Sequence, residues 1–315
     1  MDFLLTALFF FVSLALGIAS VWFIARKNKE LGLVGIDINK KEQNRIPEST
    51  GIALLVPLWV CTLAFCMMAG NSSIKTSAFY WIAMVSLFAL LGLFDDIKPK
   101  FLSKTRKWRY RAMLAGLVSL GFSALFFHSL AGIVLGALFL AGIASFENTF
   151  AGLNGWEVGS GFILSVFFSL LLIGTPYFLL SIALSGSILA LLVFNVFPAR
   201  VFPGDSGTLL IGSGLAGLLI LTGSITLMSV AFLFFTPHMI DFAVKMATNP
   251  RDPSQRKTRP YKLLKDSRIG LPDNSGKYDF AKLLIRLFGP MQEKQIVLLI
   301  WVIVIANCTA WFILF

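Results

Sequence analysis

Carboxylate side chains stand at the ends of several long apolar stretches of this chain. Of its 16 Asp and Glu residues, five lie at or beside such an end: Asp95, Asp96, Glu147, Glu157 and Asp205. An ionisable group at the edge of a membrane span is costly and therefore points to a function. Carboxylate oxygens suit a hard cation such as Mg²⁺, and a cation of this kind can serve phosphoryl transfer.

The first acidic pair, Asp95 and Asp96, ends the stretch LLGLFDD. Adjacent helical residues point about 100° apart, so one carboxylate can face a cavity while its neighbour holds a supporting group. Seven Lys and Arg residues follow between Lys98 and Arg111, with Lys107 among them. The alternative interpretation is that these two acids only balance the positive charge of the basic residues that follow the apolar stretch.

A second polar segment, FENTFAGLNGWEVGSG, covers residues 146–161. Asn148, Asn154 and Glu157 offer amide and carboxylate oxygens for a hard cation. Gly152 is one of the glycines that let the backbone approach a ligand closely. An ordinary Gly/Asn turn remains an equal alternative.

A third segment, VFPGDSG, places Asp205 and Ser206 where another apolar stretch begins. A helix start favours Asp or Ser as the capping residue, which is the simpler interpretation of Asp205. A carboxylate there can also hold a metal, and the backbone N–H groups of the first turn favour phosphate.

Basic residues are concentrated in one long polar connection at about 242–294. Twelve Lys or Arg residues lie between Lys245 and Lys294, Arg251 and Arg256 among them. They are enough to bind a diphosphate or a lipid headgroup, although a solvated basic loop is the simpler reading of most of them. His128 and His238 stand apart from these segments and are typical of satisfied helix residues rather than of catalysts.

The elements that must position these groups are membrane helices. The 315 residues are 57% hydrophobic, and their mean hydropathy is +0.81, which excludes a soluble domain. The apolar stretches are continuous rather than alternating, so we expect an all-α bundle and not a barrel. We predict about ten spans, near 3–25, 51–69, 78–94, 112–127, 130–146, 159–173, 177–194, 207–222, 224–241 and 295–315.

Charge orients the predicted bundle. Of 27 Lys and Arg residues, all but Lys75 fall in the connections after odd-numbered spans, which places those connections in the cytoplasm and both termini outside. The formal charge of +11 reflects this asymmetry and attraction to anionic lipid, and gives no argument for nucleic acid. We expect residues 1–315 to form a single membrane-embedded domain, with a retained first helix and a cytoplasmic loop at about 242–294. The three cysteines lie in apolar spans and are expected to serve packing.

Five motifs, in order, resemble one known family, the polyprenyl-phosphate N-acetylhexosamine 1-phosphate transferases. The resemblance covers nearly the whole chain and is nearest to the eukaryotic and archaeal branch that makes dolichyl diphosphate N-acetylglucosamine. That branch ends its first loop in IPES-x-G, as this chain does, where bacterial relatives usually have Pro-Arg-x-Gly-Gly. The motifs are GIDINKKEQNRIPESTG, LLGLFDDI, NTFAGLNGWEVG, VFPGDSG and LLIRLFGPMQEKQIVLL.

The resemblance implies a ten-helix fold with a cytoplasmic active site and a Mg²⁺ ion, or Mn²⁺ in its place. It implies transfer of N-acetylglucosamine 1-phosphate from UDP-N-acetylglucosamine to dolichyl or another polyprenyl phosphate, with release of UMP, as the first membrane step of N-glycosylation. The membrane would be the cell membrane in a prokaryote and the endoplasmic reticulum in a eukaryote, and a homodimer is left open. Carried over by position, the metal ligands are Asn148 and Asp205, the catalytic residues are Asp95, Asp96 and Lys107, and the substrate-binding residues are Ile38, Glu48, Gly152, Asn154, Phe202, Arg251 and Arg256.

Two positions depart from the family pattern. Lys107 matches the family's phosphate-binding Lys only if two extra residues are allowed, so Lys104 or Arg106 is an alternative. The branch's Pro-Arg-His-Arg segment is reduced here to PRDP at 250–253, so Arg256 or Arg259 would have to replace the missing sugar contact.

Two rival interpretations remain. One is the same reaction with another UDP-sugar, or with undecaprenyl phosphate for a cell-wall polymer. The other is a transporter or lipid flippase, which would carry ionisable residues near the bilayer midplane and paired halves of similar pattern. In this chain the acids instead gather at one predicted face.

Overall fold

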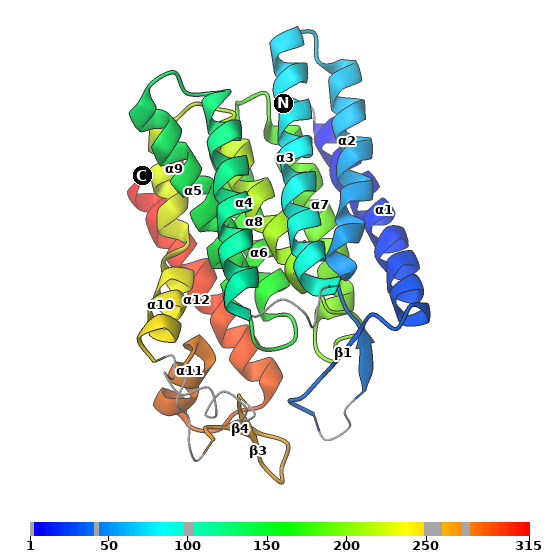
Figure 1. The fold of residues 1–315 in the computed structure, drawn as a ribbon, viewed down its shortest axis with the longest axis vertical. Coiled ribbons are helices and arrows are strands. Elements are labelled where there is room, and N and C mark those ends of the chain that lie inside the picture. Colours follow the sequence, from blue (N-terminus) through cyan, green and yellow to red (C-terminus); the bar gives the residue numbers. More distant parts are fainter. Residues whose placement is uncertain (1–2, 41–43, 98–103, 249–259, 273–277) are drawn as a thin grey trace.

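The computed structural model describes residues 3–40, 44–97, 104–248, 260–272 and 278–315, with side chains in the 104–108 stretch excepted. Within these ranges the chain forms twelve α-helices, one short 3-10 helix and two small antiparallel hairpins (Figure 1). The all-helical expectation is therefore confirmed.

The first half of the chain holds four long helices and one hairpin. The hairpin pairs Val34 with Pro47 and Ile36 with Arg45, so its two strands run antiparallel. These elements are α1 (Phe3–Glu30), β1 (Val34–Ile36), β2 (Arg45–Pro47), η1 (Thr50–Leu54), α2 (Leu55–Met68), α3 (Ser72–Ile97) and α4 (Lys104–Ala124).

The second half adds eight helices and a second hairpin, in which Leu263 pairs with Ile269. These elements are α5 (Leu130–Thr149), α6 (Trp156–Leu171), α7 (Phe178–Asn195), α8 (Gly204–Ile220), α9 (Ile225–Phe234), α10 (Thr236–Ala247), β3 (Lys262–Leu263), β4 (Ile269–Gly270), α11 (Phe280–Phe288) and α12 (Glu293–Leu314).

Each of the ten predicted apolar stretches contains helix, but the ninth is not one straight helix. It is divided into α9 and α10, which are bent by 60° at a short break. Pro237 lies in the first turn of α10, a place that proline tolerates and where it cannot continue a preceding helix. The amphipathic helix α11, inside the long basic connection, was not predicted.

Six helices are long and apolar enough to cross a membrane, and α9 with α10 would make a seventh. α6 and α8 are apolar but shorter, and α4 begins with the basic sequence KTRKWRYR. The protein is thus an integral membrane protein with many spans, while the number ten stays a prediction.

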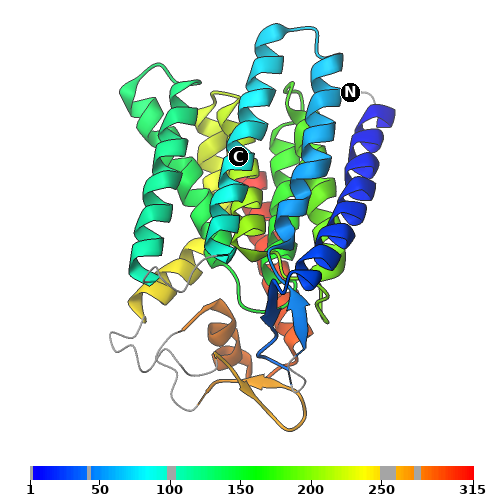
Figure 2. The same cartoon turned by 45° about the vertical axis from the view of Figure 1, so that its right-hand side comes forward.

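Both hairpins and α11 gather at one end of the helical bundle, and both termini lie in the half away from them (Figures 1 and 2). The polar segments singled out in the sequence therefore share one end of the molecule. Placing that end in the cytoplasm still rests on the charge asymmetry.

The helix α8 is the centre of the bundle. Every residue from 206 to 220 is buried, and α8 packs against α3, α5, α6 and α7. A helix that is apolar on all sides must be surrounded by protein or lipid, which agrees with its sequence. Because α8 is enclosed, the position of its N-terminal end is set by its neighbours.

Gly92 on α3 allows the closest of these approaches. A Cβ atom at Gly92 would lie 2.3 Å from the carbonyl oxygen of Asp205 and 2.4 Å from the backbone nitrogen of Ser206. Only a residue without a side chain fits there, so α3 and the first turn of α8 are in backbone contact.

We predict that Gly92→Ala pushes the start of α8 away from α3, lowers thermal stability and abolishes activity. Overpacking of this kind costs about 1–3 kcal/mol. The matched control is Gly116→Ala on α4, where nothing lies within 4 Å of the added Cβ. Thermal unfolding and turnover in detergent measure both effects, and a fully active, wild-type-stable Gly92→Ala would contradict the described contact.

The membrane orientation can be tested by thiol labelling, since Cys61, Cys66 and Cys308 are buried and should react slowly. An impermeant reagent applied to intact cells should label Ser73→Cys, which precedes most of α3, and should leave Lys265→Cys in the second hairpin unlabelled. Both residues are exposed, so both variants should react once the membrane is opened. The opposite pattern in intact cells would reverse the predicted topology.

Candidate active site

The carboxylate of Asp96 binds the N-terminal end of α8. Its two oxygens accept hydrogen bonds from the backbone nitrogens of Asp205, at 2.8 Å, and of Ser206, at 3.1 Å. These N–H groups have no partner inside their own helix, and the helix dipole favours a negative charge there. The interpretation of Asp205 as the capping residue is therefore wrong, because Asp96 on α3 does the capping.

Three oxygen-bearing side chains from three helices converge on the guanidinium of Arg111. Its Nη1 atom lies 2.9 Å from Asp95 Oδ2 and 2.5 Å from Asp205 Oδ2. The amide of Asn148 fits best with its nitrogen toward Thr208 and Asp205, which puts its oxygen 3.2 Å from Arg111 Nη1. The predicted residues Asp95, Asp205 and Asn148 are thus brought together.

Arg111 was missed as a site residue because the sequence shows it only as one of seven basic residues. Its place on α4, fifteen residues after Asp96, gives no signal that its side chain returns to the end of α3. The predicted Lys107 belongs to the same helix, but its side chain lies outside the described residues.

The cluster has the donor chemistry of a magnesium site. Mg²⁺ usually takes one or two carboxylates together with waters and substrate phosphates. No group of three His, Cys, Asp or Glu side chains able to hold a metal alone occurs among the described residues. Asn148 and Asp205 lie next to each other, with the Asn148 amide nitrogen 3.0 Å from Asp205 Oδ1. If the amide turned, its oxygen would join the carboxylate, so the two residues fit Mg²⁺ as a pair completed by a substrate.

Segments that lie close to Asn148 and Asp205 in the chain line a cavity of about 230 Å³. Four of the predicted substrate-binding residues are part of this lining. Ile38 comes from the loop of the first hairpin, Gly152 and Asn154 from the connection before α6, and Phe202 from the segment before α8. The hairpin and the segment before α8 are joined directly, because Phe202 donates to the carbonyl of Pro47 at 2.8 Å.

Glu48 lies close to this junction. Gly35 is packed against the ring of Phe202, and a Cβ there would also lie 3.3 Å from Glu48 Oε2. Burial raises the pKa of the Glu48 carboxyl, and the nearby charge of Asp96 raises it further. Glu48 is thus positioned between the cavity and the acidic end of α3.

Tyr261, from the long basic connection, lies against the cavity-lining residue Gly152, and no motif in the sequence singled it out. Its hydroxyl would lie 3.0 Å from a Cβ at Gly152, and it donates to Asp279 Oδ2 at 2.9 Å. Burial and the Asp279 charge raise the pKa of Tyr261 well above its usual value, so the hydroxyl stays protonated. Arg251 and Arg256, predicted to bind the substrate, lie outside the described residues.

Two charged residues of α10 hold the connection that follows Asn148. Lys245 Nζ donates to the carbonyl oxygens of Thr149, at 2.5 Å, and Ala151, at 3.3 Å, and it pairs with Asp241 at 2.7 Å. A cation suits the carbonyl end of a helix, here α5. Asp241 also accepts from the backbone nitrogen of Phe280, which ties α11 to the same place.

His238 is not the satisfied helix residue that its sequence context suggested. Its imidazole is fully buried, lies 3.4 Å from Glu147 Oε2 and stacks on Phe150 with ring centroids 3.9 Å apart. Neither of its ring nitrogens has a hydrogen-bond partner within the described part of the chain. His238 therefore packs behind the segment that carries Asn148.

Comparisons with known proteins identify the family of this chain. The sequence profile of glycosyl transferase family 4 matches residues 78–223, which include both Asp residues of α3, Asn148 and Asp205. A Lactobacillus delbrueckii subsp. bulgaricus protein named phospho-N-acetylmuramoyl-pentapeptide-transferase is 30% identical over 227 residues, 64% of this chain and 70% of its own. The chain belongs to glycosyl transferase family 4.

Archaeal relatives match more of the chain. A Saccharolobus solfataricus protein, provisionally named a UDP-N-acetylglucosamine–dolichyl-phosphate N-acetylglucosaminephosphotransferase, is 28% identical over 93% of this chain and 90% of its own. A Methanocaldococcus jannaschii protein, provisionally named a glycosyltransferase, is 29% identical over 85% of this chain and 83% of its own. As a family 4 member, the protein is a glycosyl-1-phosphate transferase that acts on a polyprenyl phosphate, and members of this family typically depend on Mg²⁺.

We predict that Arg111→Met lowers kcat at least about 100-fold, the usual effect of removing one positioned charge from a phosphoryl-transfer site. The loss also leaves Asp95 and Asp205 without their shared cation. The kcat of Arg111→Lys should lie between those of the wild type and Arg111→Met, because lysine keeps the positive charge but lacks the planar guanidinium group.

The matched control is Arg109→Met, which removes an exposed positive charge from the same helix. Steady-state kinetics on detergent-purified protein separate kcat from KM. Equal activity of Arg111→Met and Arg109→Met would show that the guanidinium cluster has no part in turnover.

Proposed function

We propose that this family 4 enzyme transfers N-acetylglucosamine 1-phosphate from UDP-N-acetylglucosamine to a dolichyl-type polyprenyl phosphate and releases UMP. The provisional names of the archaeal relatives, which match about nine tenths of the chain, support this choice. So do the IPES and AGLNG sequences of the loops that line the cavity. The reaction would be the first membrane step in building a lipid-linked oligosaccharide for N-glycosylation.

The observation that carries the proposal is the meeting of oxygen atoms from α3, α5 and α8 around one guanidinium. The cluster comes from α3, α4, α5 and α8, and the cavity is lined by residues 36–39, by residues 152–154 and Glu157 that follow α5 and by Phe202 just before α8. A nucleotide base in the cavity would therefore place its diphosphate toward the cluster.

In the proposed reaction an oxygen of the lipid phosphate attacks the β-phosphorus in line. A new phosphorus–oxygen bond forms, the bond from the β-phosphorus to the bridging oxygen breaks, and UMP leaves with that oxygen. The lipid phosphate is already anionic at neutral pH, so little base catalysis is needed. The enzyme must instead position two phosphate groups that repel each other.

This chain's residues supply that positioning. Arg111 neutralises charge beside Asp95 and Asp205, and the backbone start of α8 fixes the direction of the Asp205 carboxylate. Mg²⁺ held by Asn148 and Asp205 would supply further charge neutralisation at the diphosphate. Both oxygens of Asp96 bind backbone N–H groups, which favours a positioning role over a covalent nucleophile for that residue.

A second candidate is the same reaction with another UDP-sugar or with undecaprenyl phosphate for a cell-wall polymer. The Lactobacillus relative favours it, since its name specifies a muramoyl-pentapeptide substrate. A transporter or flippase is less well supported, because the acidic cluster lies at the ends of α3 and α5 and at the start of α8 rather than at mid-helix.

Purified full-length protein with Mg²⁺ and radiolabelled UDP-N-acetylglucosamine tests the proposal. Label should pass into the lipid phase with dolichyl phosphate and more slowly with undecaprenyl phosphate, and EDTA should stop the transfer. A parallel reaction with UDP-N-acetylmuramoyl-pentapeptide tests the second candidate. Label that stays in water with every lipid phosphate would refute transferase activity on this substrate.

Asp205→Asn should reduce turnover at least about 1,000-fold, because the uncharged amide attracts Mg²⁺ less strongly than a carboxylate does and no longer forms an ion pair with Arg111. The matched control is Asp266→Asn, since Asp266 pairs with Arg268 on an exposed turn. Both variants should insert and purify like the wild type. Wild-type turnover in Asp205→Asn would remove Asp205 from the proposed metal site.

A further inference from the structure

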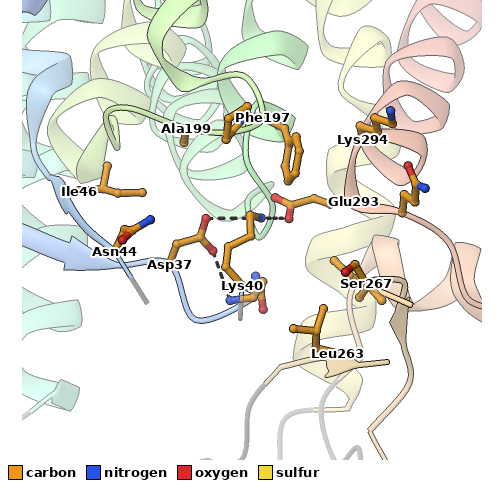
Figure 3. A pocket seen from close by; sticks show the side chains of 14 residues that line it. Asp37, Lys40, Asn44, Ile46, Phe197, Ala199, Leu263, Ser267, Glu293 and Lys294 are labelled. Atoms are coloured by element: carbon orange, nitrogen blue, oxygen red, sulfur yellow. Dashed lines mark hydrogen bonds and ion pairs between the residues drawn. The ribbon is translucent and has the colours of Figure 1, made fainter. Parts of the chain in front are cut away.

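A second cavity, of about 510 Å³, lies next to the proposed nucleotide cavity, and Asp37 and Asn39 line both. Figure 3 shows that Asp37, Lys40 and Glu293 meet in this second cavity. These three charged residues come from the first hairpin loop and from the start of α12. Their contacts explain how Asn154 is held.

Asn154 is bound through two nitrogen atoms by two different carboxylates. Its backbone nitrogen donates to Glu293 Oε1 at 2.9 Å, and its side-chain Nδ2 donates to Asp37 Oδ2 at 2.8 Å. Asn154 is 7% exposed, Asp37 6% and Glu293 4%. The contacts are thus largely shielded from water, where each hydrogen bond matters more.

Lys40 connects the two carboxylates. Its Nζ atom lies 3.4 Å from Asp37 Oδ2, contacts Glu293 Oε2 directly and stands 4.5 Å from the centroid of the Phe197 ring. A carboxylate beside an ammonium group offers acceptor atoms only. Asp37 can therefore bind the nitrogen of the Asn154 amide but not its oxygen.

This arrangement fixes the direction of the Asn154 amide. If the amide turned by 180°, Asn154 Oδ1 would face Asp37 Oδ2 at hydrogen-bond distance, with two acceptors opposed and no proton between them. The NH2 donor and the C=O acceptor of the Asn154 amide therefore keep fixed positions at the cavity and cannot exchange places.

Uracil and cytosine differ in that order. Uracil offers an N3–H donor beside the O4 acceptor, whereas cytosine offers the N3 acceptor beside an N4 amino donor. We infer that Asp37, supported by Lys40 and Glu293, is a specificity-determining positioning residue that makes Asn154 select uracil over cytosine. This inference rests on the proposed function, in which the base occupies the cavity that Asn154 lines.

The experiment compares the binding of UDP and CDP to full-length protein in detergent, by calorimetry or by competition against labelled UDP. The wild type should prefer UDP. In Asp37→Asn, residue 37 can donate or accept, so the Asn154 amide is free to turn and the ratio of CDP Kd to UDP Kd should fall about tenfold or more. Asp37→Ser should lower the ratio in the same way if the isosteric variant does not fold.

The control variant is Asp266→Asn, which makes the same chemical change on an exposed turn and should keep the wild-type ratio. A purely structural effect of Asp37→Asn would weaken UDP and CDP equally and leave the ratio unchanged, and that result overturns the inference. Failure of the wild type to bind UDP at all would instead refute the proposed function, so the two outcomes are distinct.

Discussion

The site depends on the attachment of a carboxylate from one helix to the start of another. Asp96 accepts two backbone hydrogen bonds from the first turn of α8, where the unpaired N–H groups and the helix dipole both favour negative charge. One turn earlier on α3, Gly92 leaves room for the backbones to touch. The two residues lie on the same face of α3, so a single helix surface sets both the distance and the direction of α8. Asp205 can reach Arg111 only because this surface holds it in place.

Three lysine or arginine side chains repeat the same arrangement at three places around the site. Arg111 lies between carboxylates from two helices, Lys40 between carboxylates from a loop and a helix start, and Lys245 between Asp241 and the last carbonyl groups of α5. Paired charges of this kind contribute little net stability, because desolvation offsets most of their attraction. Removing one partner is costly, however, since a charge is then left without compensation. Such clusters therefore define positions more than they stabilise the fold, which is what a site built from segments far apart in the chain requires.

The sequence was informative where a single segment determines the outcome. The helices followed from continuous apolar stretches, and the angle between adjacent helical residues accounts for the different partners of Asp95 and Asp96. What could not be predicted depends on contacts between segments far apart in the chain. Arg111 looked like any other basic residue until α4 returned beside α3, and Asp205 looked like its own helix's cap because nothing in VFPGDSG reveals a carboxylate more than 100 residues earlier. The break between α9 and α10 had a local signal in Pro237, but an apolar stretch of that length reads equally well as one helix.

The contact between Lys40 and Glu293 joins positions 253 residues apart in the chain. All membrane helices but the last precede Glu293, so the 510 Å³ cavity that Glu293 lines is completed only when the start of α12 has been translated. Until then the backbone nitrogen of Asn154 lacks the carboxylate that binds it in the finished protein. The last helix thus completes a polar cluster whose other members were translated long before it.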